Sequence, residues 1–368
     1  MLYEKLKEPF VGREEEARAI LLALLTREHV VLIGEPGTAK SAMARRLAEL
    51  INARFFKYLL TKYTEPSELF GPLDLRALKE GRYTRITRGK LPEAEIVFLD
   101  EVFNANSAIL NALLSIMQER VWYDGYSEIR VPLWSLIGAT NRVPEDPELE
   151  AVYDRFLFRQ YARPLPENRW SELLDAGWRL EAGLVEPAKP VVTLDDIAEM
   201  NKAIFSVDIS PVKPKLLRLF AILEERGIHL TDRRKTKTLK AVAANAFLEG
   251  RQRAEERDLI VLKYIAPRDI ADFDKVSIVL SEELKMPERF IKELEDIRRN
   301  IQEAARHVDS MRSYDPRLID MFRSLKIAKS RILNILRETD DERVQYLAKE
   351  TLKSIDELLE KISYKLGM

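Results

Sequence analysis

Hydrophobic residues in the first 165 positions are grouped into short runs that are separated by helix-like segments. The runs that begin at Val30, Phe55, Ile96, Leu133 and Phe156 are mostly apolar, which is typical of strands buried on both faces of a sheet. The segments between them, such as 41–55 and 106–120, repeat apolar residues every three or four positions, as amphipathic helices do. This alternation predicts a three-layer α/β domain with a five-stranded parallel sheet.

Two stretches in the same region have the pattern of a β-hairpin. Residues 82–87, RYTRIT, alternate in polarity within a long segment that is punctuated by glycine and proline. Residues 121–131 carry Tyr-Asp-Gly-Tyr at positions 123–126 between alternating apolar residues, and Asp-Gly is a frequent hairpin turn. We expect a hairpin at both places.

The pattern changes after residue 183, where GLVEPAKPVV has the composition of a linker. The stretch from there to about Phe273 predicts the helices of a smaller all-α unit. Beyond it, three amphipathic runs between residues 290 and 362 predict three long helices in an antiparallel bundle. We therefore expect three domains: an α/β domain over 1–185, an all-α lid over 186–273 and a helical bundle over 274–368.

Composition excludes several classes of site. The 368 residues include no cysteine, which rules out disulfides and thiolate sites, and the three histidines are too far apart in sequence to form a ligand pair. The 60 basic and 61 acidic residues give a net charge of −1, so the chain as a whole has no attraction to nucleic acid. No run is long and apolar enough to span a membrane and no leader is evident, so a cytoplasmic location is expected.

Residues 29–41, HVVLIGEPGTAKS, have the order of a phosphate-binding loop. A buried strand ends at Gly34, Gly37 gives the backbone further freedom, and Lys40 and Ser41 follow at the start of a helix. In this arrangement the lysine reaches the β- and γ-phosphates and the hydroxyl can ligate Mg²⁺. The usual second glycine is Ala39 here, and a strand that turns into a helix with an incidental lysine is the alternative interpretation.

A second set of chemistry-bearing residues follows about 60 positions later. The strand IVFL ends in adjacent carboxylates, Asp100 and Glu101. ATPases place a magnesium-ordering Asp and a water-activating Glu at this point, after a lysine loop. The alternative is an acidic strand end without a catalytic role, and the upstream Lys40 disfavours it.

Taken together, these motifs resemble those of the MoxR family of AAA+ ATPases, and most of all its RavA-like branch. The resemblance covers about residues 8–270: GEPGTAKS corresponds to the loop, which has alanine before lysine in that branch too, and IVFLDE corresponds to Walker B. The segments ATN, YDRF and TDRR correspond to sensor 1, the arginine finger and sensor 2. The insertion that binds a partner in RavA has no counterpart here.

The resemblance implies a role for each matched residue. Glu101 polarises the attacking water, Asn141 positions it, and Arg155 reaches the γ-phosphate of a neighbouring subunit. Sensor 2 is Arg233 or Arg234, with Arg233 favoured, and the alternative for Arg234 is a solvated helix charge. Ser41 and Asp100 hold the metal. The residues expected to contact the nucleotide are Val11, Gly12, Gly34, Glu35, Pro36, Gly37, Thr38, Ala39, Lys40, Ser41, Ala42 and Asp100.

The resemblance also implies a function: a chaperone-like ATPase that uses ATP and Mg²⁺ to remodel or mature client protein complexes. Its implied partners are copies of itself in a hexameric ring, a protein client and a von Willebrand factor A-domain protein. A rival hypothesis is a nucleic-acid-dependent motor of the same clade, because basic residues cluster at Arg82, Arg85, Arg88 and Lys90. A nucleotide-gated scaffold without turnover is the third.

Overall fold

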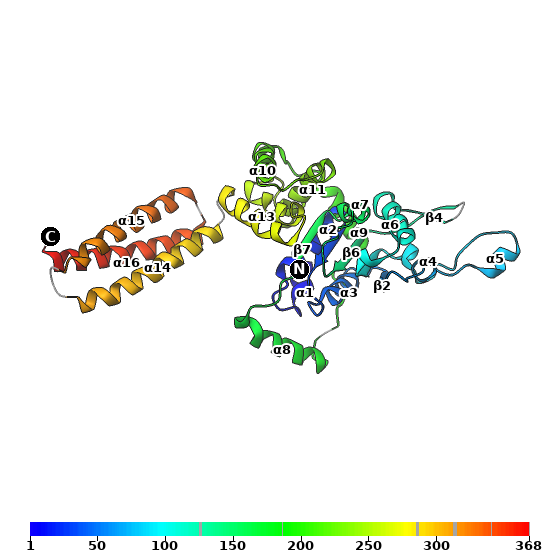
Figure 1. Ribbon diagram of the computed structural model, residues 1–368, viewed down its shortest axis with the longest axis horizontal. Helices are drawn as coiled ribbons and strands as arrows, with labels where there is room; N and C mark the ends of the chain where they lie inside the picture. The colour runs from blue at the N-terminus through cyan, green and yellow to red at the C-terminus, as the bar shows by residue number, and fades with distance from the viewer. Residues whose placement is uncertain (125–126, 186, 285–286, 312–314, 340, 368) are drawn as a thin grey trace. The chain divides into compact units, whose positions relative to one another are not determined.

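A computed structural model describes residues 1–124, 127–185, 187–284, 287–311, 315–339 and 341–367. These residues form two compact units, Met1–Val276 and Ser277–Met368 (Figure 1). Each unit has its own buried hydrophobic cluster. In the described segments, each helix is either too short or too polar to cross a lipid bilayer.

The first unit is built on a five-stranded parallel sheet with the order β2-β3-β6-β1-β7. Its strands are β1 (Val30–Ile33), β2 (Phe55–Leu59), β3 (Ile96–Asp100), β6 (Ser135–Thr140) and β7 (Phe158–Tyr161). Every residue of β1 and β6 is buried. The predicted sheet is therefore confirmed, and β6 lies between the strands that lead to the two candidate motifs.

Helices cover both faces of this sheet. On one face, Val31 and Leu99 belong to a cluster with Leu113 of α6 (Ser107–Glu119) and Val152 of α7 (Pro147–Arg155). On the other face, α2 (Glu14–Thr26) and α3 (Lys40–Leu50) contact the central strands, and α1 (Leu2–Lys7) packs against both of these helices. The three-layer α/β architecture follows from the fully apolar strands, which need cover on both faces.

The two predicted hairpins have different outcomes. β4 (Val121–Asp124) and β5 (Ser127–Arg130) form an antiparallel pair in which Trp122 lies opposite Ile129, and the turn predicted at 125–126 lies outside the described residues. The hairpin predicted at 82–87 is wrong. This stretch follows α4 (Pro66–Phe70) and α5 (Leu75–Lys79), and its backbone pairs with residues 72–74 rather than with itself, as in the bridge from Arg85 to Leu73.

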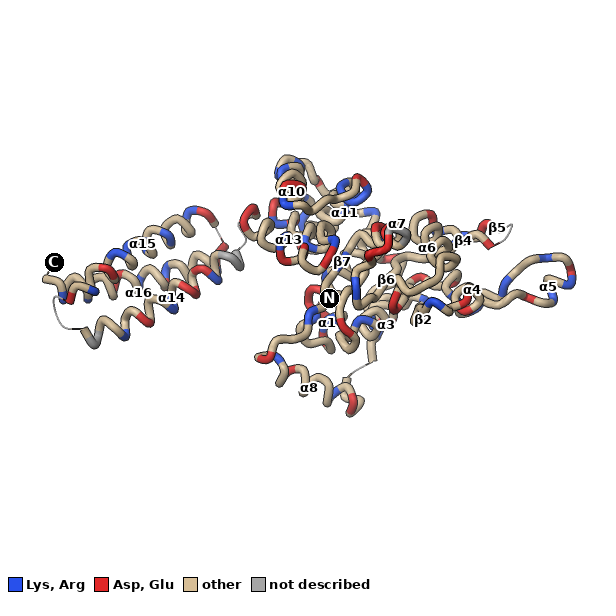
Figure 2. The backbone as a smooth tube through the Cα atoms, in the orientation of Figure 1, with Lys and Arg blue, Asp and Glu red and all other residues tan. Residues whose placement is uncertain are grey.

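The segment from α4 to residue 90 projects from the edge of the sheet (Figure 1). Lys and Arg positions are frequent at its far end around α5 (Figure 2). This projection is the long insert that precedes β3 in the sequence.

The remaining helices of the first unit follow β7. They are α8 (Trp170–Glu181), α9 (Leu194–Ile204), α10 (Lys213–Glu225), α11 (Asp232–Leu248) and α12 (Leu262–Ile265). Helix α13 (Ile270–Glu283) contains the boundary between the two units.

The second unit consists mainly of α14 (Pro287–Ser310), α15 (Arg317–Glu338) and α16 (Glu342–Leu366). Their buried stripes meet in one cluster that includes Leu294, Ile332 and Ile355, as the amphipathic pattern predicted. Residues 313–314 and 340, in the predicted turns, lie outside the described residues. The predicted domain boundary at 273/274 falls inside α13, and the division into three domains stays a prediction.

Candidate active site

The loop between β1 and α3 has the backbone that phosphate binding requires. Gly34 has φ 146° and a Cβ at this position would lie 2.5 Å from the carbonyl oxygen of Ala162, so no side chain fits. Gly37 has φ 85°, and Ala39, which replaces the second glycine of the usual pattern, has φ 61° and ψ 15°. Ala39 therefore adopts the left-handed conformation at a steric cost of about 1–2 kcal/mol. Alanine therefore adopts here the conformation that glycine adopts without steric cost.

The ammonium group of Lys40 is turned into this loop. Its Nζ donates to the carbonyl oxygens of Gly34 at 2.6 Å and Glu35 at 2.8 Å, and it lies 3.3 Å from the Thr38 hydroxyl. Burial lowers the pKa of Lys40, while the carboxylates of Asp100 and Glu101 act in the opposite direction. A positive charge is thus fixed inside a ring of loop backbone, next to the first turn of α3, which contains Ser41 and Ala42.

Asp100, Glu101 and Asn141 lie at the carboxyl edge of the sheet, as the loop does. Asp100 ends β3, and Glu101 follows it in a left-handed conformation with φ 50°. Asn141 follows β6, the neighbouring strand, and its Nδ2 donates to Glu101 Oε1 at 2.6 Å. Because β6 lies between β1 and β3, Asn141 stands between the phosphate loop and the carboxylates.

The carboxyl group of Glu101 has a raised pKa. Burial is the main cause and the neighbouring Asp100 adds to it, whereas Lys40 and Asn141 favour the charged form. A carboxylate that is partly desolvated and oriented by an amide is a stronger base than an exposed one. The arrangement can therefore orient a water molecule and accept a proton from it.

The donors for a divalent cation fit Mg²⁺. The candidate ligands are the hydroxyl of Ser41, in the first turn of α3, and the carboxylate of Asp100, at the end of β3. Hard oxygen donors that leave room for water and phosphate oxygens are the usual Mg²⁺ ligands. The set contains no nitrogen or sulfur ligand that would favour a transition metal.

The segment before α2 lies beside the end of β7. Gly12 has φ 65°, and a Cβ there would collide with the side chain of Leu165. Arg13 is 7% exposed and donates to the carboxylate of Glu16 at 3.1 Å and to the carbonyl oxygen of Arg163 at 2.8 Å. These contacts hold Val11 and Gly12 against the chain that leaves the carboxyl edge of the sheet, where the loop is.

Arg155 and Arg233 meet at one acceptor. Arg155 Nη2 donates to Gln118 Oε1 at 2.8 Å, and Arg233 Nη2 lies 3.5 Å from the same oxygen. Arg233 Nη1 also lies 3.6 Å from the carboxylate of Asp154. The pKa of Arg155 is lowered by burial and by the charge of Arg233. Two guanidinium groups are therefore held close together, with the carboxylate of Asp154 beside them.

This pair lies at the amino edge of the sheet. The residue before Gln118, Met117, accepts a hydrogen bond at 2.9 Å from His29, which directly precedes β1, and Arg155 lies three residues before β7. β1 is four residues long, so about 13 Å of strand separates this edge from the phosphate loop. The arginines and the loop are thus on opposite edges of one sheet.

Arg234 is buried rather than solvated, so the alternative of a solvated helix charge is wrong. The residue is 2% exposed, and its guanidinium group donates to the carbonyl oxygens of Phe156 at 2.9 Å, Leu157 at 2.8 Å and Ile265 at 3.0 Å. These contacts fasten the start of α11 to the turn before β7. The adjacent arginines therefore have different surroundings, and only Arg233 lies beside Arg155.

Two residues of the site were not predicted from the sequence. Asn104 lies near Glu101, with its Nδ2 atom 3.5 Å from Oε2 of Glu101. Because Asn104 follows this carboxylate by only three residues, its proximity could have been predicted from the sequence. Gln118 joins the two arginines, and it has no signal of this kind because its partners come from α7 and α11. Long-range partners of this kind can be found only in the folded chain.

Comparison with protein-family models gives two matches along this chain. A model described as the MoxR domain in the MoxR-vWA-beta-propeller ternary systems matches residues 1–202. A model described as an AAA lid domain matches residues 209–280. Together they include the sheet, the insert and the helices that follow as far as α12, together with most of α13.

Relatives with known sequences or structures agree with these matches. An uncharacterized protein of Methanocaldococcus jannaschii is 44% identical over 279 residues, which is 75% of this chain and 73% of that protein. The chaperone MoxR1 of Mycobacterium tuberculosis is 28% identical over 204 residues, 55% of this chain and 52% of that protein. A crystal structure described as a candidate ATPase from Cytophaga hutchinsonii, 20% identical, has a TM-score of 0.63. The match covers 77% of this chain and 92% of that one, and it shows the shared fold.

Proposed function

This chain belongs to the MoxR family of AAA+ proteins, and on that premise we propose that it hydrolyses ATP in a homo-oligomeric ring, most simply a hexamer, to remodel client protein complexes. The observation that carries the proposal is the hydrogen bond from Asn141 to Glu101 at the carboxyl edge, beside the loop that holds Lys40. A bound phosphate chain, a base and a water-orienting amide are the parts that phosphoryl transfer to water requires.

In this mechanism each residue acts on the nucleotide or on the attacking water. The backbone of Gly34 to Ala39 and the ammonium of Lys40 hold the β- and γ-phosphates. Glu101, oriented by Asn141, accepts the proton of the water as it attacks. Ser41 and Asp100 hold Mg²⁺, which neutralises charge on the phosphate oxygens when it is bound.

Arg155 and Arg233 act on the nucleotide of a neighbouring subunit. Both lie at the amino edge of the sheet, so neither reaches the loop of its own chain, and both are held by Gln118. A guanidinium supplied by a neighbour stabilises charge on the transferred phosphoryl group and contributes on the order of 10³–10⁵ in rate. Their shared position supports Arg233, rather than Arg234, as the sensor 2 residue.

The client is a protein complex, and a von Willebrand factor A-domain protein is the proposed partner. The name of the matching family model, which describes MoxR–vWA systems, supports this partner. The relative named Chaperone MoxR1 supports a chaperone-like role. Alanine before the loop lysine supports assignment to the RavA-like branch.

The basic residues of the insert do not favour a nucleic-acid motor. Arg85 donates to the carboxylate of Asp124 at 3.0 Å and to the carbonyl oxygen of Gly71 at 3.0 Å. Arg82 pairs with Glu80, and Lys90 donates to the carbonyl oxygen of Glu68 at 2.9 Å. Most of this cluster therefore has partners within the chain, which leaves few charges for phosphate contacts.

The proposal is tested by steady-state ATP hydrolysis and by binding of a fluorescent ATP analogue. Lys40→Ala should lose nucleotide binding, because the charge that faces the phosphates is gone. Glu101→Gln should bind ATP like the parent and lose about 10²–10⁴ in turnover, because an amide cannot accept the proton. Glu101→Gln with ATP is also the form with which to isolate the client, and normal turnover in this variant would contradict the mechanism.

A further inference from the structure

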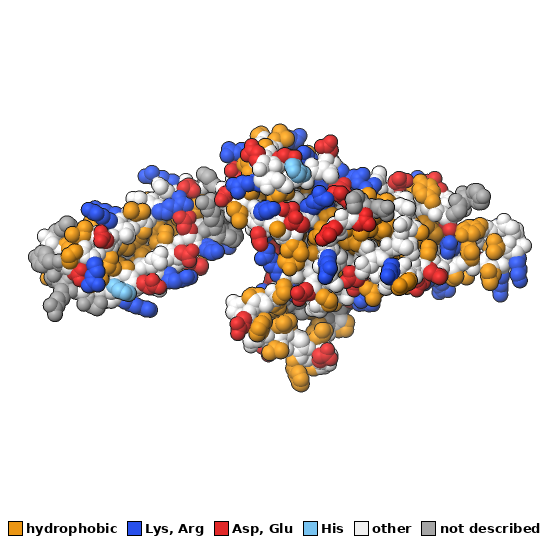
Figure 3. Space-filling view, viewed as in Figure 1, with side chains coloured by type: hydrophobic (Ala, Val, Ile, Leu, Met, Phe, Trp, Pro, Cys, Tyr) orange, Lys and Arg blue, Asp and Glu red, His pale blue; other side chains and the backbone are white. Residues whose placement is uncertain are grey.

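Helix α8 carries an apolar stripe that no part of its own chain covers in the described residues. None of its twelve residues is buried. Trp170, Leu173, Leu174 and Trp178 are spaced as one helical face, and they are 52%, 46%, 73% and 76% exposed. The helix stands away from the sheet in Figure 1, and Figure 3 shows hydrophobic side chains gathered on it. An exposed surface of this kind marks an interaction site.

The chain that leads into α8 leaves the carboxyl edge of the sheet, where the phosphate loop lies. Ala162, which follows β7, donates its N–H to the carbonyl oxygen of Ile33 at 2.7 Å and lies against Gly34 of the phosphate loop. The chain then passes Leu165, which packs on Gly12, and enters α8 at Trp170. α8 is thus rooted beside the loop and not beside the arginine pair.

The helix is acidic as well as apolar. It contains the carboxylates Glu172, Asp175 and Glu181 against one cation, Arg179. Glu172 is paired with Arg169, whereas Asp175 and Glu181 have no ion pair with any residue that the structure describes. An interaction partner for α8 therefore needs an apolar surface bordered by positive charge.

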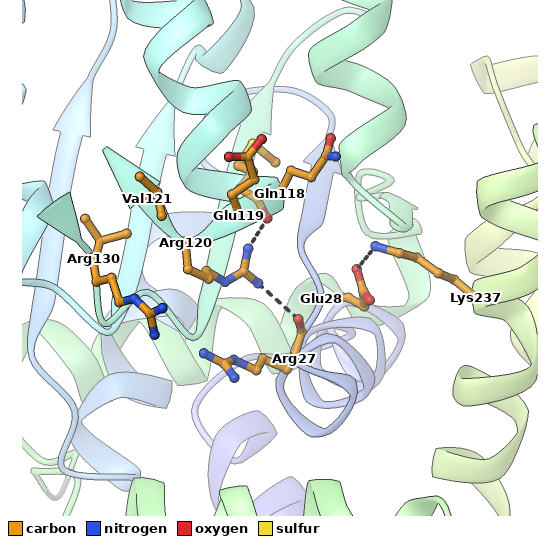
Figure 4. Close-up of a pocket in the computed structure, with 10 residues that line it drawn as sticks. Arg27, Glu28, Gln118, Glu119, Arg120, Val121, Arg130 and Lys237 are labelled. Carbon is orange, nitrogen blue, oxygen red and sulfur yellow. Dashed lines mark hydrogen bonds and ion pairs between the residues drawn. The ribbon is translucent and has the colours of Figure 1, made fainter. Parts of the chain in front are cut away.

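A cavity with the required positive charge lies at the opposite edge of the sheet, next to the arginine pair. It encloses about 520 Å³ and includes four cations, Arg27, Arg120, Arg130 and Lys237, against the carboxylates of Glu28 and Glu119 (Figure 4). Gln118, which holds Arg155 and Arg233, also lines it. The cavity and the arginine pair are therefore parts of one surface.

The charges of this cavity are only partly neutralised. Glu28 is paired with Lys237 at 2.7 Å and with Lys240 at 2.6 Å. The guanidinium of Arg27 stacks over Trp134 with 4.8 Å between charge and ring centre, and neither Arg27 nor Arg130 has an ion pair within the described ranges. Arg120 donates to the carbonyl oxygen of Arg27 at 3.1 Å, and burial lowers its pKa to about 10. Arg27 and Arg130 remain available to carboxylates from outside.

We infer that α8 of one copy docks on the basic cavity of a second copy. The inference rests on the proposed function, because Arg155 can reach a second copy's nucleotide only if the surface that carries the cavity faces the edge from which α8 projects. That contact brings an acidic, apolar helix to a cationic surface. The two surfaces are different and lie at opposite edges, so the contact is head-to-tail and repeats around a ring.

The contact is tested by cross-linking, for which a chain without cysteine is suited. Leu174→Cys and Arg130→Cys are prepared separately, one with a size tag, and mixed with ATP and a short bismaleimide. We expect a cross-linked pair that contains one chain of each kind, and little product from either variant alone. Leu217→Cys is the matched control for Leu174→Cys, because Leu217 on α10 is 67% exposed. Equal yields with this control, or no mixed pair, would overturn the inference.

A second experiment separates this inference from the proposed ATPase activity. The double variant Leu174→Asp, Trp178→Asp should weaken self-association by about tenfold or more. Its melting temperature and its binding of the ATP analogue should stay as in the parent, because both side chains are already exposed. Leu217→Asp should assemble normally. If the parent hydrolyses ATP and the double variant assembles as well as the parent, the docking of α8 is wrong; if cross-linking succeeds and the parent does not hydrolyse ATP, the proposed function is wrong.

Discussion

Ala39 and Glu101 are both non-glycine residues in the left-handed region, and both lie at the carboxyl edge of the sheet. Such conformations are costly and persist where the surrounding structure enforces them, which is common at functional sites. At Ala39 the left-handed conformation leads the loop into α3, whose first residue is Lys40. At Glu101 it directs the carboxylate toward Asn141 rather than along the strand.

Replacing Ala39 by glycine should be tolerated. The change removes the left-handed strain of about 1–2 kcal/mol and adds about 0.5–1 kcal/mol of unfolded-state entropy, so the free energy of unfolding should stay level or rise by up to about 1.5 kcal/mol. Urea denaturation and ATP-analogue titration measure the two quantities. Ala42→Gly, in the first turn of α3, is the control and should only destabilise, because its backbone is helical. A loss of nucleotide affinity in Ala39→Gly would contradict this account of the loop.

The raised pKa of Glu101 should appear in the pH dependence of turnover. Only the carboxylate accepts a proton, so turnover should fall on acidification through a pKa above the ordinary value of 4.5. Asn141 stabilises the charged form, so Asn141→Ala should raise this pKa further and move the acid limb to higher pH.

Asn104→Ala is the control for that shift, because Asn104 lies 3.5 Å from Glu101 and should have less effect. Turnover measured between about pH 5 and 9 checks both variants. An acid limb that does not move in Asn141→Ala would show that another group sets the pH dependence.

At the scale of elements, α11 is joined to the turn before β7 through its first residues. Thr231 accepts a hydrogen bond from the Arg234 N–H, and the Arg234 side chain donates to the carbonyl oxygens of two consecutive residues in the turn and of the last residue of α12. This anchor fixes Arg233, the preceding residue, next to α7. One arginine thus holds the helix in place, and its neighbour stays available at the surface.

Arg234→Met should therefore lower the stability of the fold, whereas Arg233→Met should lower turnover. Arg234→Met leaves buried carbonyl groups without donors and should lower the free energy of unfolding by about 3 kcal/mol. Arg233→Met should change stability by less than about 0.5 kcal/mol and reduce turnover of the assembled protein. Thermal denaturation and ATP hydrolysis measured on both variants test the assignment, and a stable, inactive Arg234→Met would reverse it.

At the scale of the whole molecule, the first unit separates the phosphate loop from the arginine pair by the full length of the sheet strands. In the proposed mechanism, a single chain has one half of the site at each edge. Turnover should then depend on assembly, and any change that weakens the contact between copies should lower turnover without altering nucleotide binding by each chain.

Mixing two inactive variants tests this dependence. Arg155→Ala should bind ATP normally and hydrolyse it slowly, and Glu101→Gln should do the same for a different reason. Mixed assemblies contain contacts at which an intact Arg155 faces an intact Glu101, so turnover should partly return after subunit exchange. Mixed assemblies without recovered turnover, or full activity in a monomeric parent, would contradict a site shared between subunits.

The sequence by itself determined the parts that depend on local order. Apolar runs separated by amphipathic segments specified the five-stranded sheet, and the Lys40 loop and the Asp100–Glu101 pair follow their strands directly, so their edge of the sheet was predictable. The hairpin predicted at 82–87 failed because alternation does not specify the partner, and that segment pairs with residues 72–74.

The features that depend on long-range contacts were decided only by the tertiary structure. Arg233 and Arg234 are adjacent in sequence, yet one is buried against three carbonyl groups and the other meets Arg155 at Gln118, because helical geometry turns successive side chains to different sides of α11. The exposure of α8 and the basic cavity likewise depend on which surfaces the chain covers by folding back on itself. Local order fixed the chemistry of the site, and packing fixed which charges remain available to a second molecule.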